Sequence, residues 1–281
     1  GIFAREDSVL GTLELDGVRV EGSQGHGLFV SGRLPSANYA QAGVQNVVVS
    51  NSQFIDNAQA NQNFANLFLY EFDGNADFDN VDVSNSVGGL NSAAYGIQIS
   101  GVDGPEHDQI GTYGAPGQTY DVLSPIGSIT FHDVDVTGQY RKPGLFVQGY
   151  TDMSGLDFSE GGNTVDATST LWGKPVVIDP MADLLPTGTP GTPGNAGSFF
   201  DASAANGSYS LVGLEVSAPE GHFNELDGTT EADTITGSNF ADQITGFDGA
   251  DTISAGDGDD AIVYRESGDL DAGETVDGGD G

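Results

Sequence analysis

The chain has 281 residues, of which 37% are hydrophobic and 43 are glycine, so it has apolar material for a long core but too much glycine for a helical one. Seven Lys and Arg residues stand against 42 Asp and Glu residues, which gives a formal net charge of −35. This charge, without a large basic patch, excludes nucleic acid and anionic membranes as partners and favours divalent cations.

The sequence contains no run of about 18 apolar residues and no signal-peptide pattern, so we expect no membrane span. It contains no cysteine, which is compatible with export as an unfolded thread. The chain begins with Gly1 and ends with "DGGDG", the opening of another repeat unit. We therefore expect both ends to be cut from a longer protein.

A loose repeat fills the region before residue 227. In each copy two apolar residues are separated by one residue, two further residues follow, and a second such apolar pair comes next. Its fullest versions are "LELDGVRV" (13–20), "ADFDNVDV" (76–83), "ITFHDVDV" (129–136) and "YSLVGLEV" (209–216). We expect its copies to begin at Leu13, Ala42, Ala76, Ile129, Thr151 and Tyr209. The alternation predicts strands, and the Asp, Asn or Gly residues between the two pairs predict a corner.

A companion strand follows most copies. The companions are "GLFVSG" (27–32), "NLFLYE" (66–71), "GIQISG" (96–101), "GLFVQG" (144–149) and "PVVIDP" (175–180). Strand, corner, strand, loop and strand make one coil, which is typical of a right-handed parallel β-helix. Two inward columns are predicted, one of Leu15, Phe78, Phe131 and Leu211, the other of Val18, Val81, Val134 and Leu214.

The spacing of the copies is irregular, and the longest insertions cover residues 102–128 and 180–208. The second contains "LLPTGTPGTPGNAGSFF", which is typical either of a mobile linker or of a loop lying on the solenoid. A strand copy follows it at Tyr209, which favours the loop. We therefore predict a β-helix domain over residues 1–226 and a second domain over residues 227–281.

A strict nine-residue repeat begins near Asp227, with Asp at 233, 242, 251 and 260 and Ile two residues after each. Such a period fits neither a helix nor a plain strand, and it predicts one half-turn of a stacked coil. The alternative, an acidic disordered tail, would not keep Ile at every ninth position. Each unit has the form Gly (or Ala)-x-x-x-x-Asp-x-Ile-x, which resembles the haemolysin-type RTX nonapeptide.

The resemblance implies a calcium-binding β-roll, in which turn carbonyls and one carboxylate per unit hold the ion between stacked turns. The predicted metal ligands are Asp233, Asp242, Asp248, Asp251, Asp257 and Asp260. The units "GFDGAD" (246–251) and "AGDGDD" (255–260) lie closest to the family pattern. The two units before them lack its second and fourth glycines.

The β-helix part resembles a wide class that includes polysaccharide lyases, epimerases, tail spikes and adhesins. Its combination with RTX units is similar to secreted mannuronan C5-epimerases and to large RTX surface proteins. Those epimerases carry an Asp-Pro-His-Glu segment, which does not occur here. The nearest string, "GPEHDQ" (104–109), has a different order and fits a solvated turn equally well, so we name no catalytic residue.

The segment "GQYRKPG" (138–144) holds an adjacent pair of basic residues. It is either a corner whose cations offset neighbouring acidic side chains or a place where a glycan binds. For the second case, the predicted contacts are Tyr140, Arg141 and Lys142 with Tyr113, Tyr120 and Trp172.

Two functions are compatible with these features. The first is a calcium-rigidified segment of a large secreted or cell-surface protein, with a structural, adhesive or glycan-contacting role. Its partners would be calcium and an extracellular polysaccharide or another surface protein. The second is a polysaccharide-modifying enzyme of the mannuronan C5-epimerase or polyuronate lyase class, whose main catalytic coils lie upstream.

Overall fold

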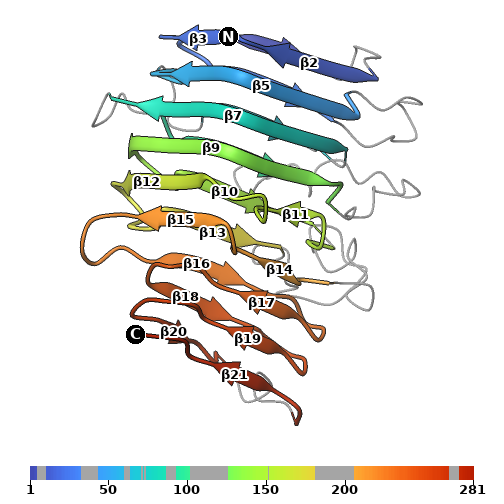
Figure 1. Ribbon diagram of the computed structural model, residues 1–281, viewed down its shortest axis with the longest axis vertical. Helices are drawn as coiled ribbons and strands as arrows, with labels where there is room; N and C mark the ends of the chain where they lie inside the picture. Colours follow the sequence, from blue (N-terminus) through green and yellow to red (C-terminus); the bar gives the residue numbers. More distant parts are fainter. Residues whose placement is uncertain are drawn as a thin grey trace, which may run out of the picture.

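The computed structural model describes residues 1–4, 11–32, 44–59, 64–70, 72, 74–86, 93–101, 126–150, 152–180, 206–265 and 272–281. Within these residues the chain is all-β without a helix, so no helix that could cross a membrane occurs there. Paired strands run parallel throughout, and Figure 1 shows them stacked along the long axis from the N-terminus to the C-terminal coils. The predicted all-β, parallel arrangement is confirmed, and it has the form of a β-solenoid.

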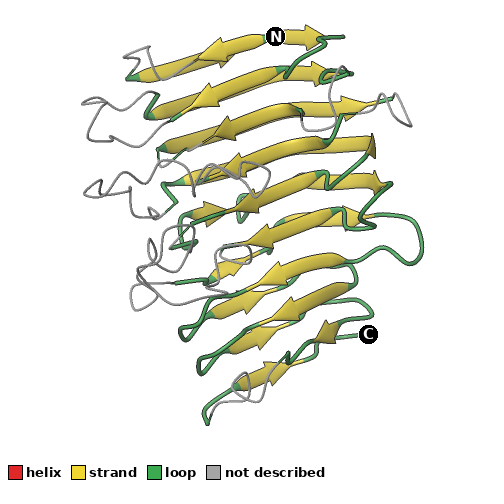
Figure 2. Cartoon of the chain, turned by 180° about the vertical axis from the view of Figure 1, so that it is seen from behind, coloured by secondary structure: helices red, strands yellow, loops and turns green. Residues whose placement is uncertain are grey.

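The first sheet runs the length of the molecule and contains nine strands. In spatial order they are β1 (Ile2–Ala4), β4 (Leu28–Ser31), β6 (Ala65–Tyr70), β8 (Tyr95–Ser100), β10 (Leu145–Gln148), β13 (Val176–Asp179), β16 (Asn224–Asp227), β18 (Asp242–Thr245) and β20 (Ala261–Ile262). Five of these, β4, β6, β8, β10 and β13, are the predicted companion strands. The reverse view in Figure 2 shows the same succession of parallel strands.

Two further sheets complete the coils. The second contains β2 (Thr12–Asp16), β3 (Arg19–Glu21), β5 (Asn46–Ile55), β7 (Asn75–Asn85), β9 (Ile129–Tyr140), β11 (Leu156–Asp157), β12 (Asn163–Ser169) and β15 (Leu214–Ser217). The third contains β14 (Tyr209–Ser210), β17 (Thr234–Thr236), β19 (Thr252–Ser254) and β21 (Thr275–Asp277). The core lies between the first sheet and the other two.

The inward columns form because residues in register on adjacent parallel strands face the same side. Phe78 pairs with Phe131, and the ring of Phe131 stacks on that of Phe158 at 4.8 Å between centroids. Val81 pairs with Val134, and both side chains are buried. The predicted inward positions of these four paired residues are confirmed.

Each long strand of the second sheet bends at a residue with positive φ. These residues are Asn51, Asn80 and Asp133, with φ of 49°, 54° and 50°. Asn and Asp tolerate the left-handed region because their short polar side chains can bond locally. Here Asn80 Nδ2 donates to Asn51 Oδ1 at 2.8 Å, and Asn51 Nδ2 donates to Asp16 Oδ1 at 2.9 Å. The predicted Asp and Asn corners are thus a ladder of side-chain hydrogen bonds between coils.

Two predicted copies were out of phase by five residues. The copies were expected to begin at Ala42 and Thr151, which both lie outside the described residues. In the structure the residues in register with the first residues of other copies are Val47, which pairs with Leu13, and Leu156, which pairs with Ile129. The alternation of apolar residues was hard to recognise in these two coils because each has a polar residue at the inward position that Val81 and Val134 occupy in other coils. That residue is Ser52 in one coil and Asn163 in the other.

Ser52 and Asn163 are buried and bond the backbone of neighbouring coils. Ser52 Oγ accepts from the Val18 N–H at 3.1 Å and donates to the Ser50 carbonyl at 2.7 Å. Asn163 Oδ1 accepts from the Val134 N–H at 3.2 Å. Satisfying backbone groups at a bend offsets the cost of burying a polar side chain.

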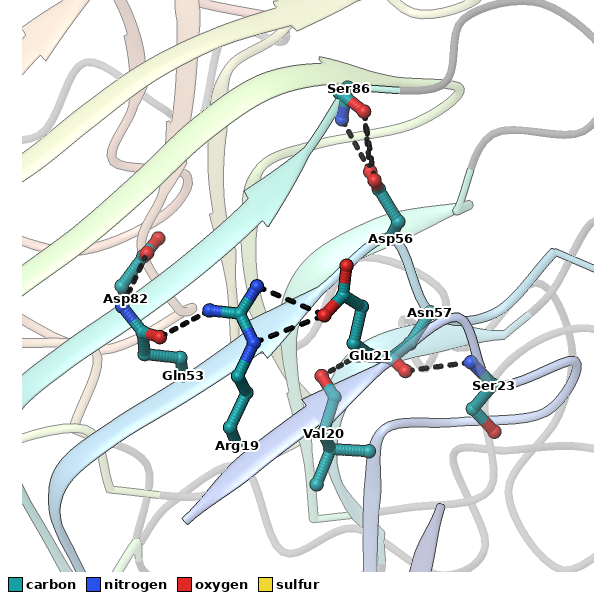
Figure 3. Close-up of polar contacts among 9 residues, drawn as sticks. All are labelled: Arg19, Val20, Glu21, Ser23, Gln53, Asp56, Asn57, Asp82 and Ser86. Atoms are coloured by element: carbon teal, nitrogen blue, oxygen red, sulfur yellow. Dashed lines mark hydrogen bonds and ion pairs between the residues drawn. The ribbon is translucent and has the colours of Figure 1, made fainter. Parts of the chain in front are cut away.

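Polar side chains also join the first three coils on the outside of the second sheet (Figure 3). Arg19 forms an ion pair with Glu21 at 2.9 Å and donates to Gln53 Oε1 at 2.5 Å. The carboxylate of Asp56 accepts from the N–H and the hydroxyl of Ser86. These contacts link neighbouring coils, and the exposed ones add little free energy.

The first sheet continues without a break through the predicted domain boundary at residue 226. β16 pairs with β13 on one side and with β18 on the other. The division into two domains therefore stays a prediction, with the hydrogen-bonded sheet common to both parts. Of the predicted insertions, residues 102–125 and 181–205 lie outside the described residues.

Candidate calcium-binding turns

Each nine-residue unit supplies one short strand, and successive units alternate between two sheets. β17 and β19 belong to the third sheet, and β18 and β20 belong to the first. Two units therefore complete a coil, and equivalent residues stack every 18 positions: Ile235 pairs with Ile253, and Ile244 with Ile262. Ile235, Ile244 and Ile253 are buried, and Ile262 is partly buried against the same core. The repeat keeps an apolar residue at this position because it packs into the narrow interior.

The repeated aspartates stack in the same way at the turns. The Asp233 N–H donates to Asp251 Oδ1 at 2.9 Å, and the Asp242 N–H donates to Asp260 Oδ1 at 2.8 Å. Asp233, Asp242 and Asp251 are each at most 2% exposed. Each carboxylate therefore reaches from its own turn into the turn of the preceding coil.

Burial sets the electrostatics of these carboxylates. Desolvation raises the pKa of Asp233 and of Asp260, and it raises the pKa of Asp242 to about 6. A shift in this direction means that the ionised form is disfavoured in the fold, and a cation beside the carboxylate would reverse that preference. The turns thus combine buried anionic groups with a sequence that has no Lys or Arg between residues 227 and 262.

The six predicted ligands differ in their exposure to solvent. The side chains of Asp248 and Asp257 are exposed. Within the described part of the chain, no three or more Asp, Glu, His or Cys side chains come together as a metal-binding group. The turns of Asp233, Asp242 and Asp251 thus each bring a single buried carboxylate, whereas Asp260 in the fourth turn is partly exposed.

The turns nevertheless fit calcium chemically. Gly249 and Gly258 have φ of 125° and 140°, which residues with a side chain rarely adopt. A Cβ on Gly258 would lie 2.7 Å from the Phe240 carbonyl oxygen, and one on Gly249 would lie 2.5 Å from that of Glu231. Backbone oxygens of one turn thus lie close to the glycine of the turn 18 residues later, where a side chain would not fit. Carbonyl and carboxylate oxygens are the donor set that calcium prefers.

The sequence prediction missed one unit. Residues 219–227 follow the same half-turn, with Asn224 in register with Asp242 and Leu226 in register with Ile244. Asn224 Nδ2 donates to Asp242 Oδ1 at 2.7 Å. The unit could have been found from the sequence, because Asn224 and Leu226 lie 18 residues before Asp242 and Ile244. It was overlooked because Asn and Leu stand where the other units have Asp and Ile.

The predicted glycan contacts are spread over different environments. Tyr140 is fully buried, and its hydroxyl donates to the carbonyls of Val83 and Thr137, so its position argues against the predicted surface contact. Arg141 is 7% exposed, so it too offers little surface to a glycan. Tyr113 and Tyr120 lie outside the described residues.

Lys142 and Trp172 do come together. Lys142 Nζ donates to the Tyr95 hydroxyl at 3.0 Å and lies 5.4 Å from the centre of the Trp172 ring. Tyr95 stacks on Phe146 at 5.3 Å, and Trp172 packs edge-on against both rings. Trp172 is 40% exposed, so it is the accessible member of this aromatic group.

Comparison with known proteins agrees with the geometry of the turns. Residues 227–262 match the model of the RTX calcium-binding nonapeptide repeat family, in four copies. No curated protein and no solved structure matches the chain. The chain therefore contains RTX calcium-binding repeats, and the resemblance predicted for these residues is confirmed.

Proposed function

We propose that this chain is a calcium-rigidified segment of a large secreted or cell-surface RTX protein, with a structural or adhesive role. In this proposal residues 1–226 form a right-handed parallel β-helix, and residues 227–281 form a β-roll that continues it. The observation that carries the proposal is the stack of buried aspartates in turns that match the RTX repeat. RTX repeats are typical of secreted proteins, where calcium is abundant enough to fill weak sites.

Calcium would stabilise the C-terminal coils by offsetting the desolvation cost of their buried carboxylates. The interior of the C-terminal coils holds one isoleucine per unit, and next to it lie carboxylates that have lost their water. Because the first sheet is continuous from β1 to β20, order gained in these coils would extend the rigid length of the whole solenoid. A stalk or surface coat needs this kind of stiffness.

Calcium titration of the whole chain tests the proposal. We expect thermal melting to shift upward as calcium rises, with Mg²⁺ at equal concentration having a smaller effect because it demands a tighter octahedral site. An unchanged melting curve up to about 10 mM calcium, in the range of weak extracellular sites, would overturn the calcium role.

A glycan-contacting role is favoured by the Tyr95, Phe146 and Trp172 group with Lys142 beside it. An exposed aromatic ring offers a flat apolar face against which the C–H face of a sugar can stack, and the ammonium adds a charged donor. Trp172 is the single tryptophan of the chain, so its fluorescence reports this place alone. Titration with neutral and acidic polysaccharides should change the emission, and Lys142→Ala should weaken binding of the acidic ones. No change with any of them would contradict the role.

The alternative is a polysaccharide-modifying enzyme of the C5-epimerase or polyuronate lyase class. Such an enzyme needs a base, an acid and a group that neutralises the substrate carboxylate. Tyr140 is a poor candidate for the base because burial raises its pKa far above the usual value. Proton NMR of alginate or pectate incubated with the protein and calcium would reveal new guluronate or unsaturated ends, and we expect neither.

A further inference from the structure

Arg141 brings a buried guanidinium to the corner between β9 and β10. Its side chain is 7% exposed, and its Nη1 atom is shielded from solvent without a hydrogen-bond partner among the residues that the structure describes. Arginine is almost never buried unless it is paired, because an ionised group taken out of water without a partner is strongly disfavoured. The guanidinium cannot avoid this cost by losing its proton, since it stays charged in proteins.

Three other basic residues of the described chain each lie within ion-pair distance of a carboxylate. The pairs are Arg19 with Glu21, Lys174 with Glu225, and Arg265 with Asp227. The chain has 42 acidic residues, yet none of those in the described ranges forms an ion pair with Arg141. Its charge is therefore left for a partner that comes from outside the chain.

Neighbouring coils hold the backbone of Arg141 in place. Its N–H donates to the Ala93 carbonyl at 3.1 Å, and its carbonyl accepts from the Leu171 N–H at 2.8 Å. The preceding residue, Tyr140, is fully buried, and its hydroxyl donates to carbonyls of two strand residues. The side chain thus extends from a fixed point, and an anion would meet it without the cost of ordering the backbone.

The residue after Arg141 adds a second positive charge at this corner. Lys142 Nζ lies 5.0 Å from the centre of the Tyr95 ring and 5.4 Å from that of Trp172. On the next coil, Leu171 and Trp172 are 60% and 40% exposed, so solvent reaches the side of the corner where Leu171 bonds to Arg141. Two consecutive cations therefore lie beside an accessible edge of the solenoid.

The net charge of −35 does not prevent an anion from binding here. At physiological ionic strength, interactions between exposed charges farther apart than about 8 Å are largely screened. The two adjacent cations, and not the distant carboxylates, then determine whether a small anion is attracted. Since Arg141 is almost covered, a single anionic group can reach it, whereas the face of a sugar ring cannot.

We propose that Arg141 forms a binding site for an oxyanion of the sulfate, phosphate or carboxylate type. The planar guanidinium carries its N–H donors in a fixed fork that matches two oxygens of such a group. The oxyanion is either a free ion or one acidic substituent of a polysaccharide. The second source rests on the glycan-contacting role proposed above, and the first does not.

Thermal melting of the whole chain in sodium sulfate, at an ionic strength held constant with sodium chloride, tests the site. A ligand that binds only the folded state raises the melting temperature as its concentration rises. We expect this rise in the wild type, and Arg141→Met should weaken sulfate binding about tenfold or more, because charge-assisted hydrogen bonds are lost. Arg19→Met removes the same charge at an exposed position and should respond like the wild type.

An equal response in the wild type and Arg141→Met would overturn the site, because sulfate also stabilises proteins in general by its exclusion from their surface. A response that Arg19→Met loses as well would overturn it too, since only the net charge would then matter. Circular dichroism establishes that each variant is folded. If Arg141→Met is not, Arg141→Gln, which is also uncharged, takes its place.

Polymers with one common backbone identify the source of the oxyanion. The emission of Trp172 is followed in parallel titrations with sodium sulfate, dextran sulfate and neutral dextran. Tighter binding of dextran sulfate than of the free ion, at equal sulfate concentration and lost in Arg141→Met, assigns the site to a polysaccharide substituent. The reverse order assigns it to a free ion. If sulfate binds and neither dextran does, the glycan-contacting role fails while the oxyanion site stands. If neither sulfate nor dextran sulfate has an effect in either measurement, the oxyanion site is wrong.

Discussion

The coils around Phe131 and the coils of the RTX units share one sheet but are stabilised differently. The first kind buries stacked aromatic rings, with Phe78 and Phe158 on either side of Phe131. The second kind buries one isoleucine per unit together with a carboxylate such as Asp242. A wide apolar core is stable by area burial alone, whereas a narrow coil with buried charge needs donors or a cation to offset desolvation.

The largest effect should come from charge placed in the wide core. Val134→Asp puts a carboxylate in a column with Val81 and without a cation, which should cost about 4 kcal/mol or more and abolish folded protein. Asp135→Asn, one residue away on the exposed side, is the matched control and should fold normally. Circular dichroism and solubility report the outcome. A folded Val134→Asp variant would show that this column is not the core.

Calcium removal should destabilise the coils of the RTX units and leave the coils around Phe131 unaffected. At a calcium concentration about 100-fold above Kd, each bound ion adds about 2.7 kcal/mol, and a chelator removes it. Hydrogen exchange should then quicken at the amides of β18 and β19, while those of β7 and β9 keep their protection. Equal quickening in both regions would mean that the aromatic coils also depend on calcium.

His26 offers a pH test confined to the N-terminal coils. It is 6% exposed, accepts the Ala65 N–H at Nδ1, and burial lowers its pKa to about 4. Because the unfolded chain binds the proton more tightly, the stability contributed by neutral His26 is complete above about pH 6.5 and declines as the pH falls toward 4. Between about pH 7 and pH 4.5 the loss should be about 2.5 kcal/mol.

Comparison with His26→Gln isolates this effect, since all other titrating groups are common to both proteins. Denaturant unfolding at both pH values gives the free energies. If the wild type and His26→Gln lose the same stability between the two pH values, His26 is not buried in its neutral form.

The smallest effect should come from the exposed polar contacts of Figure 3. The side chains of Arg19 and Glu21 are 52% and 55% exposed. Arg19→Ala should therefore cost no more than about 0.5 kcal/mol, as measured by denaturant unfolding. A loss comparable to that of a buried residue would mean that these contacts, and not the core, determine the register of the first coils.

The sequence alone determined the features that repeat at constant spacing. Asp and Ile recur every nine residues from Asp233, and the companion strands alternate cleanly, so strands, turns and the RTX family could all be predicted. These signals are local, since each unit carries its own glycine, aspartate and isoleucine. Side-chain alternation in a strand then determines which residues face inward.

Only the tertiary structure decided which polar residues face inward. Ser52 accepts the N–H of a residue 34 positions away, and Asn163 accepts one 29 positions away, so nothing in their own strands marks them as core. Tyr140 was predicted at the surface and is buried because carbonyls of two strands receive its hydroxyl. The hydrogen bond from the Asn224 amide to the Asp242 carboxylate likewise joins two coils. A buried polar group is stable only where partners meet it, and in a solenoid those partners come from the neighbouring coil.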